Sequence, residues 1–408
     1  MSPRGKLVVA LLSAVLVASC AGPGEGRRTV HASSDTPRPQ SPARRTPTPG
    51  QPAARPASPL LPAPTMAGPW RPVRVLPAAE PRTFSGVAMR ADGSAWAVGA
   101  GVDNEAWVGR FTVRGWKRVP LTGVEGAGRA VVVDQEDHLW VFTGAPDYAP
   151  DMSRSSAARW DGRSWRITDL GGGLGITRAR AIGPEVWFLA RKADVGQTDA
   201  TVVERRRPDG RWTDTHMPIR AESIDGRTPS DVWAVGRDTA TRQPAAARWN
   251  GRAWTRVALP HLPLVEGLSA LFWDVLARDT RDVWAVGGVF NDTGEEQPAQ
   301  WLIGHWDGRE WSMDVIRDDE LDGTGLTEIV DDGRHGAWIE AQWGTRLLHM
   351  DRHGRITLRQ RLEDGKCEGG DVTALVSRPG TPGLRAVGTR SSCKAGGVHR
   401  ATVYRAAA

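Results

Sequence analysis

The chain has 408 residues, enough for one large domain or two to three ordinary ones, and holds 19 Trp against 2 Tyr and 6 Phe. Its net charge of +6 lies in the first 68 residues, which carry eight basic and two acidic side chains. The other 340 residues carry 45 of each sign, which argues against a nucleic-acid-binding domain. The Trp bias predicts one structural position that is repeated along the chain.

The N-terminus predicts a lipoprotein signal peptide over residues 1–19. Arg4 and Lys6 precede an apolar run at residues 7–18, which is too short to cross a bilayer but is typical of a secretory signal. The run ends in Val-Ala-Ser-Cys, which resembles a bacterial lipobox. The resemblance implies that Cys20 is acylated and becomes the first residue of a protein anchored in the cell membrane, facing outward. The alternative is an ordinary signal peptide cleaved nearby, with Cys20 a bystander.

Residues 20–68 predict a disordered tether. Eleven prolines stand between positions 21 and 68, with Ser, Thr, Ala and Arg making up much of the rest, so there is little apolar surface to bury. In an extended polyproline conformation it would reach about 3.1 Å per residue. The composition resembles that of lipoproteins from high-GC Gram-positive bacteria.

Residues 69–408 contain a repeat. The hexapeptide DVWAVG occurs at residues 231–236 and again at 282–287, with variants at 94–99 and 383–388. About nine residues before most copies stands a β-branched residue, which indicates a strand. The position of the hexapeptide Trp recurs every 44 to 54 residues, at Trp96, Trp140, Trp187, Trp233, Trp284, Trp338 and, with the Trp replaced, Arg385.

A second motif follows, reading WDGRSW at 160–165, WNGRAW at 249–254 and WDGREW at 306–311. Asp-Gly and Asn-Gly between apolar residues predict a two-residue hairpin turn, because a type I′ turn needs positive φ at both positions. With that turn, Trp160, Arg163 and Trp165 share one face, and the guanidinium stacks on the indoles. This Trp-Arg-Trp arrangement could form binding sites for a sugar or peptide, or it could pack one sheet against the next. Its occurrence in three copies favours packing.

Each repeat therefore supplies four short strands, as in a β-propeller blade. Seven repeats predict an all-β, seven-bladed propeller. The last repeat lacks a fourth strand, and Trp70–Val75 is expected to supply it and close the ring. The alternative is six blades, if the irregular third repeat is misread. The pattern resembles the Trp-rich DVWAVG propellers of secreted actinobacterial proteins, within the kelch and galactose-oxidase-like group.

Two cysteines remain once Cys20 is set aside. Cys367 and Cys393 form an even pair in an oxidising compartment outside the cytoplasm, and we expect a disulfide between them. Cys367 precedes the first strand of the seventh blade and Cys393 follows its second strand. In an antiparallel blade these two connections emerge on the same face.

No catalytic motif, cofactor fingerprint or metal-ligand spacing is evident. His349, Asp351 and His353 alternate, but they fall on a predicted hairpin turn, so no metal is expected. The candidate ligand face is the set of loops that share the face of the expected disulfide, at the entry to the first strand of each blade. Phe272 and Trp273 there depart from the repeat, since Trp273 aligns with Ser85, Glu222, Thr327 and Ala374. The candidate residues are Arg129, Glu222, Phe272, Trp273 and Glu328.

Three functions remain open. The first is a monomeric, non-enzymatic binding or scaffolding propeller for a protein or glycan ligand, held to the membrane by its lipid. The second is an extracytoplasmic enzyme acting on glycans, which two or more carboxylates gathered at the channel mouth would favour. The third is an accessory subunit of a membrane-associated complex.

Overall fold

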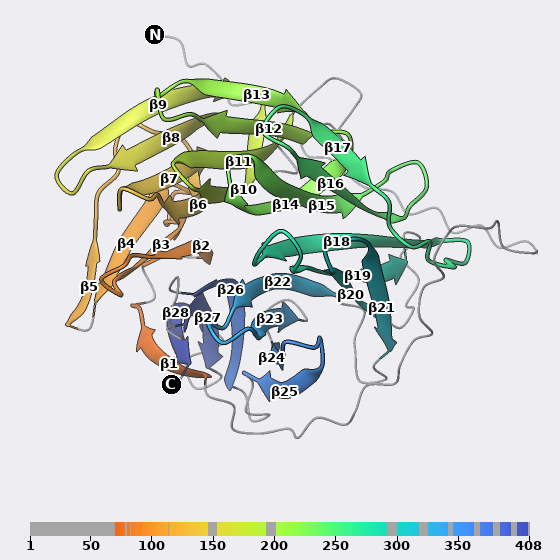
Figure 1. Cartoon of the computed structure of the whole chain (residues 1–408). Coiled ribbons are helices and arrows are strands. Elements are labelled where there is room, and N and C mark those ends of the chain that lie inside the picture. Colours follow the sequence, from red (N-terminus) through yellow and green to blue (C-terminus); the bar gives the residue numbers. More distant parts are fainter. Residues whose placement is uncertain are drawn as a thin grey trace, which may run out of the picture. The chain divides into compact units, whose positions relative to one another are not determined.

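The computed structural model describes residues 70–77, 80–81, 83–112, 114–145, 153–192, 201–291, 300–317, 325–341, 346–362, 368–377, 384–392 and 398–406. These lie in one compact unit, Pro49–Ala408, and form a ring of seven four-stranded antiparallel sheets, a seven-bladed β-propeller (Figure 1). Within these ranges there is no helix long and apolar enough to cross a membrane.

In blades one to six the strand order follows the chain, from the innermost strand outward. Their strands are β2 (Thr83–Met89), β3 (Ala95–Ala100), β4 (Ala106–Thr112) and β5 (Gly115–Arg118); β6 (Ala127–Val133), β7 (Leu139–Gly144), β8 (Arg154–Trp160) and β9 (Trp165–Gly172); β10 (Leu174–Ile182), β11 (Glu185–Lys192), β12 (Thr201–Arg206) and β13 (Trp212–His216); β14 (Arg220–Thr228), β15 (Asp231–Arg237), β16 (Pro244–Trp249) and β17 (Trp254–Val257); β18 (Leu268–Ala277), β19 (Val283–Asn291), β20 (Gln300–Trp306) and β21 (Trp311–Arg317); β22 (Leu326–Asp331), β23 (Ala337–Ala341), β24 (Arg346–Met350) and β25 (Ile356–Arg361).

The seventh blade joins both ends of the propeller. It contains β26 (Glu368–Ser377), β27 (Leu384–Ser392), β28 (Val398–Ala406) and, as its outermost strand, β1 (Trp70–Val75). β1 pairs antiparallel with β28, with Trp70 opposite Ala406, and Figure 1 shows the orange β1 beside the blue β28. Both the seven-blade count and the closure by the N-terminal strand are confirmed, and six blades are excluded.

The hexapeptide forms the second strand of a blade, and its Trp is buried in the contact with the next blade. Trp233 is 1% exposed, and its ring centroid lies 5.2 Å from that of Trp306 and 5.5 Å from that of Trp311, both in the next sheet. Trp187 meets Trp249 and Trp254 in the same way. The motif is therefore structural, because each of the first six blades supplies an indole that fills the space beside its neighbour.

The Trp-rich hairpins differ from the prediction of a two-residue turn. In β8–β9, Trp160 pairs directly with Trp165, which leaves a four-residue loop, and the other two copies pair Trp249 with Trp254 and Trp306 with Trp311. Asp161 Oδ1 accepts hydrogen bonds from the backbone N–H groups of Arg163 and Ser164, and only Gly162 of the Asp-Gly pair has positive φ. The Arg of the motif stands in this loop, so it does not occupy a stack between the two indoles.

Candidate functional site

The innermost strands of all seven blades line the axis of the ring. Each has a register shift against its second strand near its start, which leaves one residue out of the pairing, as in a β-bulge, and β14 has a second shift at Arg227. Bulges re-aim side chains and are common beside functional sites. The residues left out at the shift near the start of each strand are Ser85, Arg129, Thr177, Glu222, Trp273, Thr327 and Thr373.

Three of the five predicted ligand-face residues are therefore bulge residues: Arg129, Glu222 and Trp273. The expected counterpart of Trp273 in the last blade, Ala374, is one position off, because the bulge there falls on Thr373. Leu375, two residues after this bulge, is buried like its counterparts Val87 and Val275.

The predicted aromatic residues pack within the propeller. The side chain of Trp273 is half-buried, with its ring centroid 5.9 Å from that of Phe290. A Cβ atom on Gly325 would lie 2.1 Å from the Trp273 ring, so a glycine is needed there. Phe272 is fully buried against Trp311, with 6.2 Å between ring centroids, and lies in the core rather than on a face.

The predicted charged residues have partners. Arg129 Nε donates a hydrogen bond to the Gly144 carbonyl at 3.1 Å. Glu222 lies 2.6 Å from the guanidinium of Arg191. Glu328, which is 6% exposed, pairs with Arg178 at 3.3 Å.

The Arg178–Glu328 pair belongs to a polar cluster on the innermost strands of blades three to six. Arg180 pairs with the fully buried Asp274 at 3.3 Å, and Ser223 Oγ donates a hydrogen bond to the same carboxylate. Burial alone would lower the pKa of Arg178, but the surrounding carboxylates outweigh burial and raise it. These carboxylates are Asp274, Glu328, Glu340 and Glu222, so the cluster brings together the two predicted glutamates.

Three carboxylates of the innermost strands also join neighbouring blades. Asp225 Oδ2 accepts the backbone N–H of Ala277 at 2.8 Å, and Asp274 Oδ2 accepts that of Ile329 at 3.0 Å. Glu328 Oε2 accepts the backbone N–H of Leu375 at 2.5 Å. Each bond runs from one innermost strand to the next. These acidic groups therefore connect neighbouring blades and also lie close to the axis of the ring.

Two of these carboxyl groups have raised pKa values. Burial raises the pKa of Asp225 to about 6, although Arg180 and the backbone N–H of Ala277 oppose the shift. Burial also raises the pKa of Glu328 to about 7, against the opposing charge of Arg178. Both groups change protonation near neutral pH, which is a frequent property of functional sites.

A cavity of about 290 Å³ lies on the axis, lined by residues from all seven innermost strands. Most of its wall is aliphatic, including Val87, Val131 and Leu276, while Arg180, Asp225 and Asp331 supply charge. It lies toward the C-terminal ends of these strands, past the bulges. None of the five predicted ligand-face residues lines it.

Sequence reasoning missed Arg178, Arg180, Asp225 and Asp274. The third repeat does indicate two of them. Its first strand contains TRARAI at residues 177–182, so two arginines stand where the other repeats have mostly apolar residues. In the sequence this segment looks like an irregular repeat. The structure nevertheless has the innermost strand β10 there, and Ala179 is buried at the position that Val87 occupies in the first blade.

Within the described ranges, one group brings three metal-ligating side chains within 4.8 Å of one another: Asp134, Glu136 and His138. It does not include the predicted turn residues His349, Asp351 and His353. Asp134 Oδ1 accepts the backbone N–H groups of Glu136 and His138. The group is therefore organised as the turn between β6 and β7.

No family model matches the sequence, and no curated protein matches it. The solved structure of streptogramin B lyase aligns with 12% identity over 82% of this chain and 96% of its own, with a TM-score of 0.50. YCF48 from Cyanidioschyzon merolae aligns with 12% identity over 83% of this chain and 98% of its own, with a TM-score of 0.53. At this identity the likeness shows a shared propeller fold.

Proposed function

We propose that this chain is a lipid-anchored β-propeller at the outer surface of the cell, whose axial cavity binds a protein ligand without transforming it. The observation that carries the proposal is the cavity of about 290 Å³, with Arg180, Asp225 and Asp331 set in a mostly aliphatic wall. A concave, mostly apolar surface with a few placed polar groups is the usual form of a ligand site. The anchored location rests on the Cys20 motif, which lies outside the described residues.

The chemistry of the wall favours a protein over a glycan. Sugar rings commonly stack on aromatic side chains, and the described residues that line the cavity are aliphatic, small or charged. Aliphatic walls suit an apolar side chain from a peptide segment, while Arg180 and Asp225 suit its backbone or a charged group.

Site-specific photocrosslinking on intact cells tests the proposal. A photoreactive residue at Ser377, which lines the cavity, should yield one defined protein adduct. The same residue at Val265, which is 67% exposed and outside the cavity lining, serves as the control. Asp225→Asn and Arg180→Gln should each reduce the Ser377 adduct at least several-fold. Equal amounts of adduct from the two positions would contradict the protein-ligand proposal. So would the absence of an adduct from Ser377 together with a positive glycan-binding screen.

A second candidate, an enzyme acting on glycans, is favoured by the carboxyls of Asp225 and Glu328, whose pKa values are raised to about 6 and about 7. A carboxyl group that titrates near neutral pH is suited to general acid or base catalysis. Incubation with cell-wall glycans should then release products, and Asp225→Asn should lower the rate at least about 100-fold. Equal rates in the wild type and this variant would exclude the assignment.

A further inference from the structure

The third residue after each bulge lines the axial cavity, so every blade contributes one residue from the equivalent position of its innermost strand. Blades three and four, which are neighbours, contribute the charged residues Arg180 and Asp225. The other five residues are aliphatic: Ala88, Val132, Leu276, Val330 and Val376. A ligand in the cavity therefore meets apolar surface from five blades and charge from two at this position.

The charged residues of the cavity wall carry more negative than positive charge. One lining residue is basic, Arg180, and two are acidic, Asp225 and Asp331, which gives 1 − 2 = −1 when all three are ionised. The guanidinium of Arg180 lies 3.3 Å from the carboxylate of Asp274, which is fully buried. The positive charge of Arg180 is thus already neutralised within the wall.

Asp331 lies where the wall is open to solvent. Its side chain is 40% exposed, and its carboxylate lies 3.9 Å from Nε of Arg278. The same guanidinium lies closer to Asp282, at 3.5 Å, so Arg278 is shared between two carboxylates. Counting Arg278 and Asp282 with the wall therefore leaves the excess of negative charge in place.

Asp225 is fixed within the apolar part of the wall. Its Oδ2 accepts the backbone N–H of Ala277 at 2.8 Å, which ties the carboxylate to the innermost strand of the next blade. Its equivalents in blades three and five are Arg180 and Leu276, so the carboxylate stands where the charged part of the wall meets the aliphatic part. A ligand that combines a positive charge with an aliphatic stem matches this arrangement.

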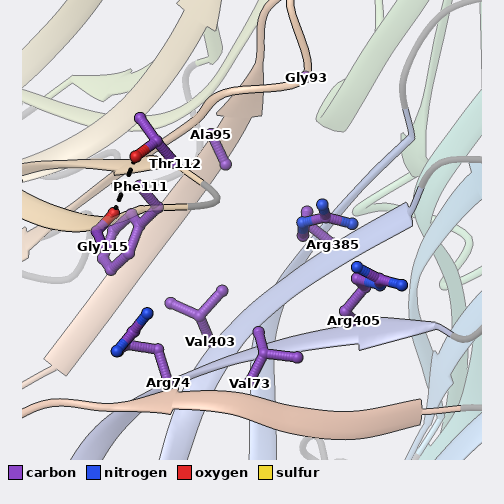
Figure 2. A pocket seen from close by; sticks show the side chains of 10 residues that line it. All are labelled: Val73, Arg74, Gly93, Ala95, Phe111, Thr112, Gly115, Arg385, Val403 and Arg405. Carbon is purple, nitrogen blue, oxygen red and sulfur yellow. Dashed lines mark hydrogen bonds between the residues drawn. The ribbon is translucent and has the colours of Figure 1, made fainter.

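Another cavity of the propeller has the opposite charge. It has a volume of about 240 Å³, lies where blade seven meets blade one, and is lined by Arg74, Arg385 and Arg405 (Figure 2). None of the described residues that line it is acidic. A cationic group would therefore be favoured in the axial cavity and disfavoured in this one.

We propose that the axial cavity binds a lysine side chain of the protein ligand, with the ammonium group on Asp225 and the methylene stem against the aliphatic wall. The inference rests on the function proposed above and names the group that is recognised. Long charged side chains bury their stems on apolar surface, and lysine carries a compact point charge on a flexible four-carbon stem. Because Asp225 Oδ2 already accepts an N–H, a single ammonium contact suits the other oxygen better than the two-pronged guanidinium of arginine.

Binding of a lysine should weaken as the pH falls. Burial raises the pKa of Asp225 to about 6, so the carboxylate is mostly ionised above that pH and mostly protonated below it. The facing charges are that of Arg180, which favours the ionised form, and that of Asp274, which disfavours it. A lysine ammonium stays protonated throughout this range, so the change comes from the cavity.

Ligand-observed NMR titrations of the full-length protein, purified in detergent, test the proposal with side-chain analogues, and detergent alone is the reference. n-Butylamine reproduces the lysine side chain and n-propylguanidine the arginine side chain, while 1-butanol is neutral and butyrate anionic. At pH 7.5 we expect n-butylamine to bind at least about fivefold more tightly than each of the other three. At pH 5, and in Asp225→Asn at either pH, its advantage over 1-butanol should disappear.

Asp161→Asn is the matched control. Asp161 is an exposed carboxylate outside the cavity lining that, like Asp225, accepts backbone N–H groups. Asn250 holds the equivalent hairpin of blade four in the same way, so the substitution preserves the loop. This variant should keep the wild-type preference for n-butylamine. The wild-type titrations at two pH values decide the question even where a variant fails to fold, and circular dichroism identifies such a variant.

Three results overturn the lysine site: no binding of n-butylamine by the wild type, equal binding of 1-butanol, or an unchanged preference in a folded Asp225→Asn protein. Tighter binding of n-propylguanidine also overturns it, in favour of arginine. The function proposed above fails separately from this inference. A protein adduct at Ser377 without a preference for n-butylamine removes only the lysine, whereas the preference without an adduct supports the cation site and contradicts the protein ligand.

Discussion

The buried indole of the hexapeptide is the residue on which contact between successive blades most depends. Trp233 is almost fully buried and meets two further indoles in the next sheet. Trp233→Ala should therefore lower the free energy of unfolding by about 3–5 kcal/mol, through lost burial and the void left behind. Urea denaturation followed by circular dichroism measures the loss. Val265→Ala, at a position 67% exposed, should change it by less than about 0.5 kcal/mol, and similar losses in the two variants would contradict the structural role.

Asp225 should make stability depend on pH in a direction opposite to that of an ordinary ion-paired carboxylate. Burial raises its pKa in the folded chain to about 6, above the usual 3.8, so the folded state retains a proton that the unfolded state has lost. Its stabilising contribution is complete below about pH 3.8 and is lost as the pH rises through 6. Because the side chain is partly exposed, we expect a loss on the order of 1 kcal/mol.

Unfolding measured from pH 4 to 7 tests this expectation with Asp225→Asn, which should gain stability relative to the wild type as the pH rises. Arg180→Gln should carry the loss to higher pH, because the charge of Arg180 opposes the rise in the pKa of Asp225. Parallel profiles for the wild type and Asp225→Asn would show that this carboxyl is not the source.

At the scale of elements, the outermost strand of blade seven depends on a side chain from blade six. Gln360 of β25 accepts a hydrogen bond from the Trp70 N–H at 3.0 Å and donates one to the Trp70 carbonyl at 2.9 Å. Gln360→Ala leaves the Trp70 N–H without this partner, while the Trp70 carbonyl keeps a hydrogen bond from Arg71 Nη1 at 2.8 Å, so the change should cost about 1–3 kcal/mol. Hydrogen exchange should then accelerate in β1 and β28.

Gln243 offers a matched control, because it bonds the N–H and carbonyl of Leu262 in the same way, at 2.9 and 3.1 Å. Gln243→Ala should destabilise blade four locally and leave exchange in β1 and β28 unchanged. If both variants accelerate exchange in β1 and β28 equally, Gln360 has no specific part in closing the ring.

The predicted disulfide also belongs to this scale. Cys367 and Cys393 lie outside the described residues, but their chain neighbours Glu368 and Ser392 are register partners at the end of the β26–β27 pair. Peptide mass mapping without reductant should find the two cysteines linked, and reduction should lower stability by about 2–4 kcal/mol. Cys367→Ser should have the same effect, with no further change on reduction. Free thiols in protein isolated without reductant would contradict the bridge.

Repeat spacing is enough to predict the strands and the number of blades, since six of the seven blades place a buried indole at the same position of the second strand. The length of a turn is harder to predict from the sequence. An Asp-Gly pair fits both a two-residue turn and the four-residue loop that contains Asp161 and Gly162. Only Glu222 and Glu328 of the polar cluster could be predicted as site residues, and their association with Arg178 could not. Arg178 and Glu328 are 150 residues apart and meet across the channel only once the ring has closed.

For the whole molecule, the central prediction is the lipid anchor. Cys20→Ala should release the protein into the medium, because a secreted chain without its acyl groups has no membrane anchor. Cell fractionation and labelling with a fatty-acid analogue measure the change. Ser19→Ala, which keeps a small residue before the cysteine, should remain in the membrane fraction. Retention of the Cys20→Ala protein in that fraction would contradict lipidation.

Closure by β1 has a mechanical consequence for a protein held by its N-terminus. Tension on the proposed tether enters the propeller at Trp70, the end of β1 that faces Ala406 in the pairing with β28. Such a load would separate β1 from β28 one residue pair at a time, starting at Trp70, which is hydrogen-bonded to Gln360. The pairing of β1 with β28, which closes the ring, is therefore the weakest point under force. The hydrogen bonds between Gln360 and Trp70 are the first that such a pull would break.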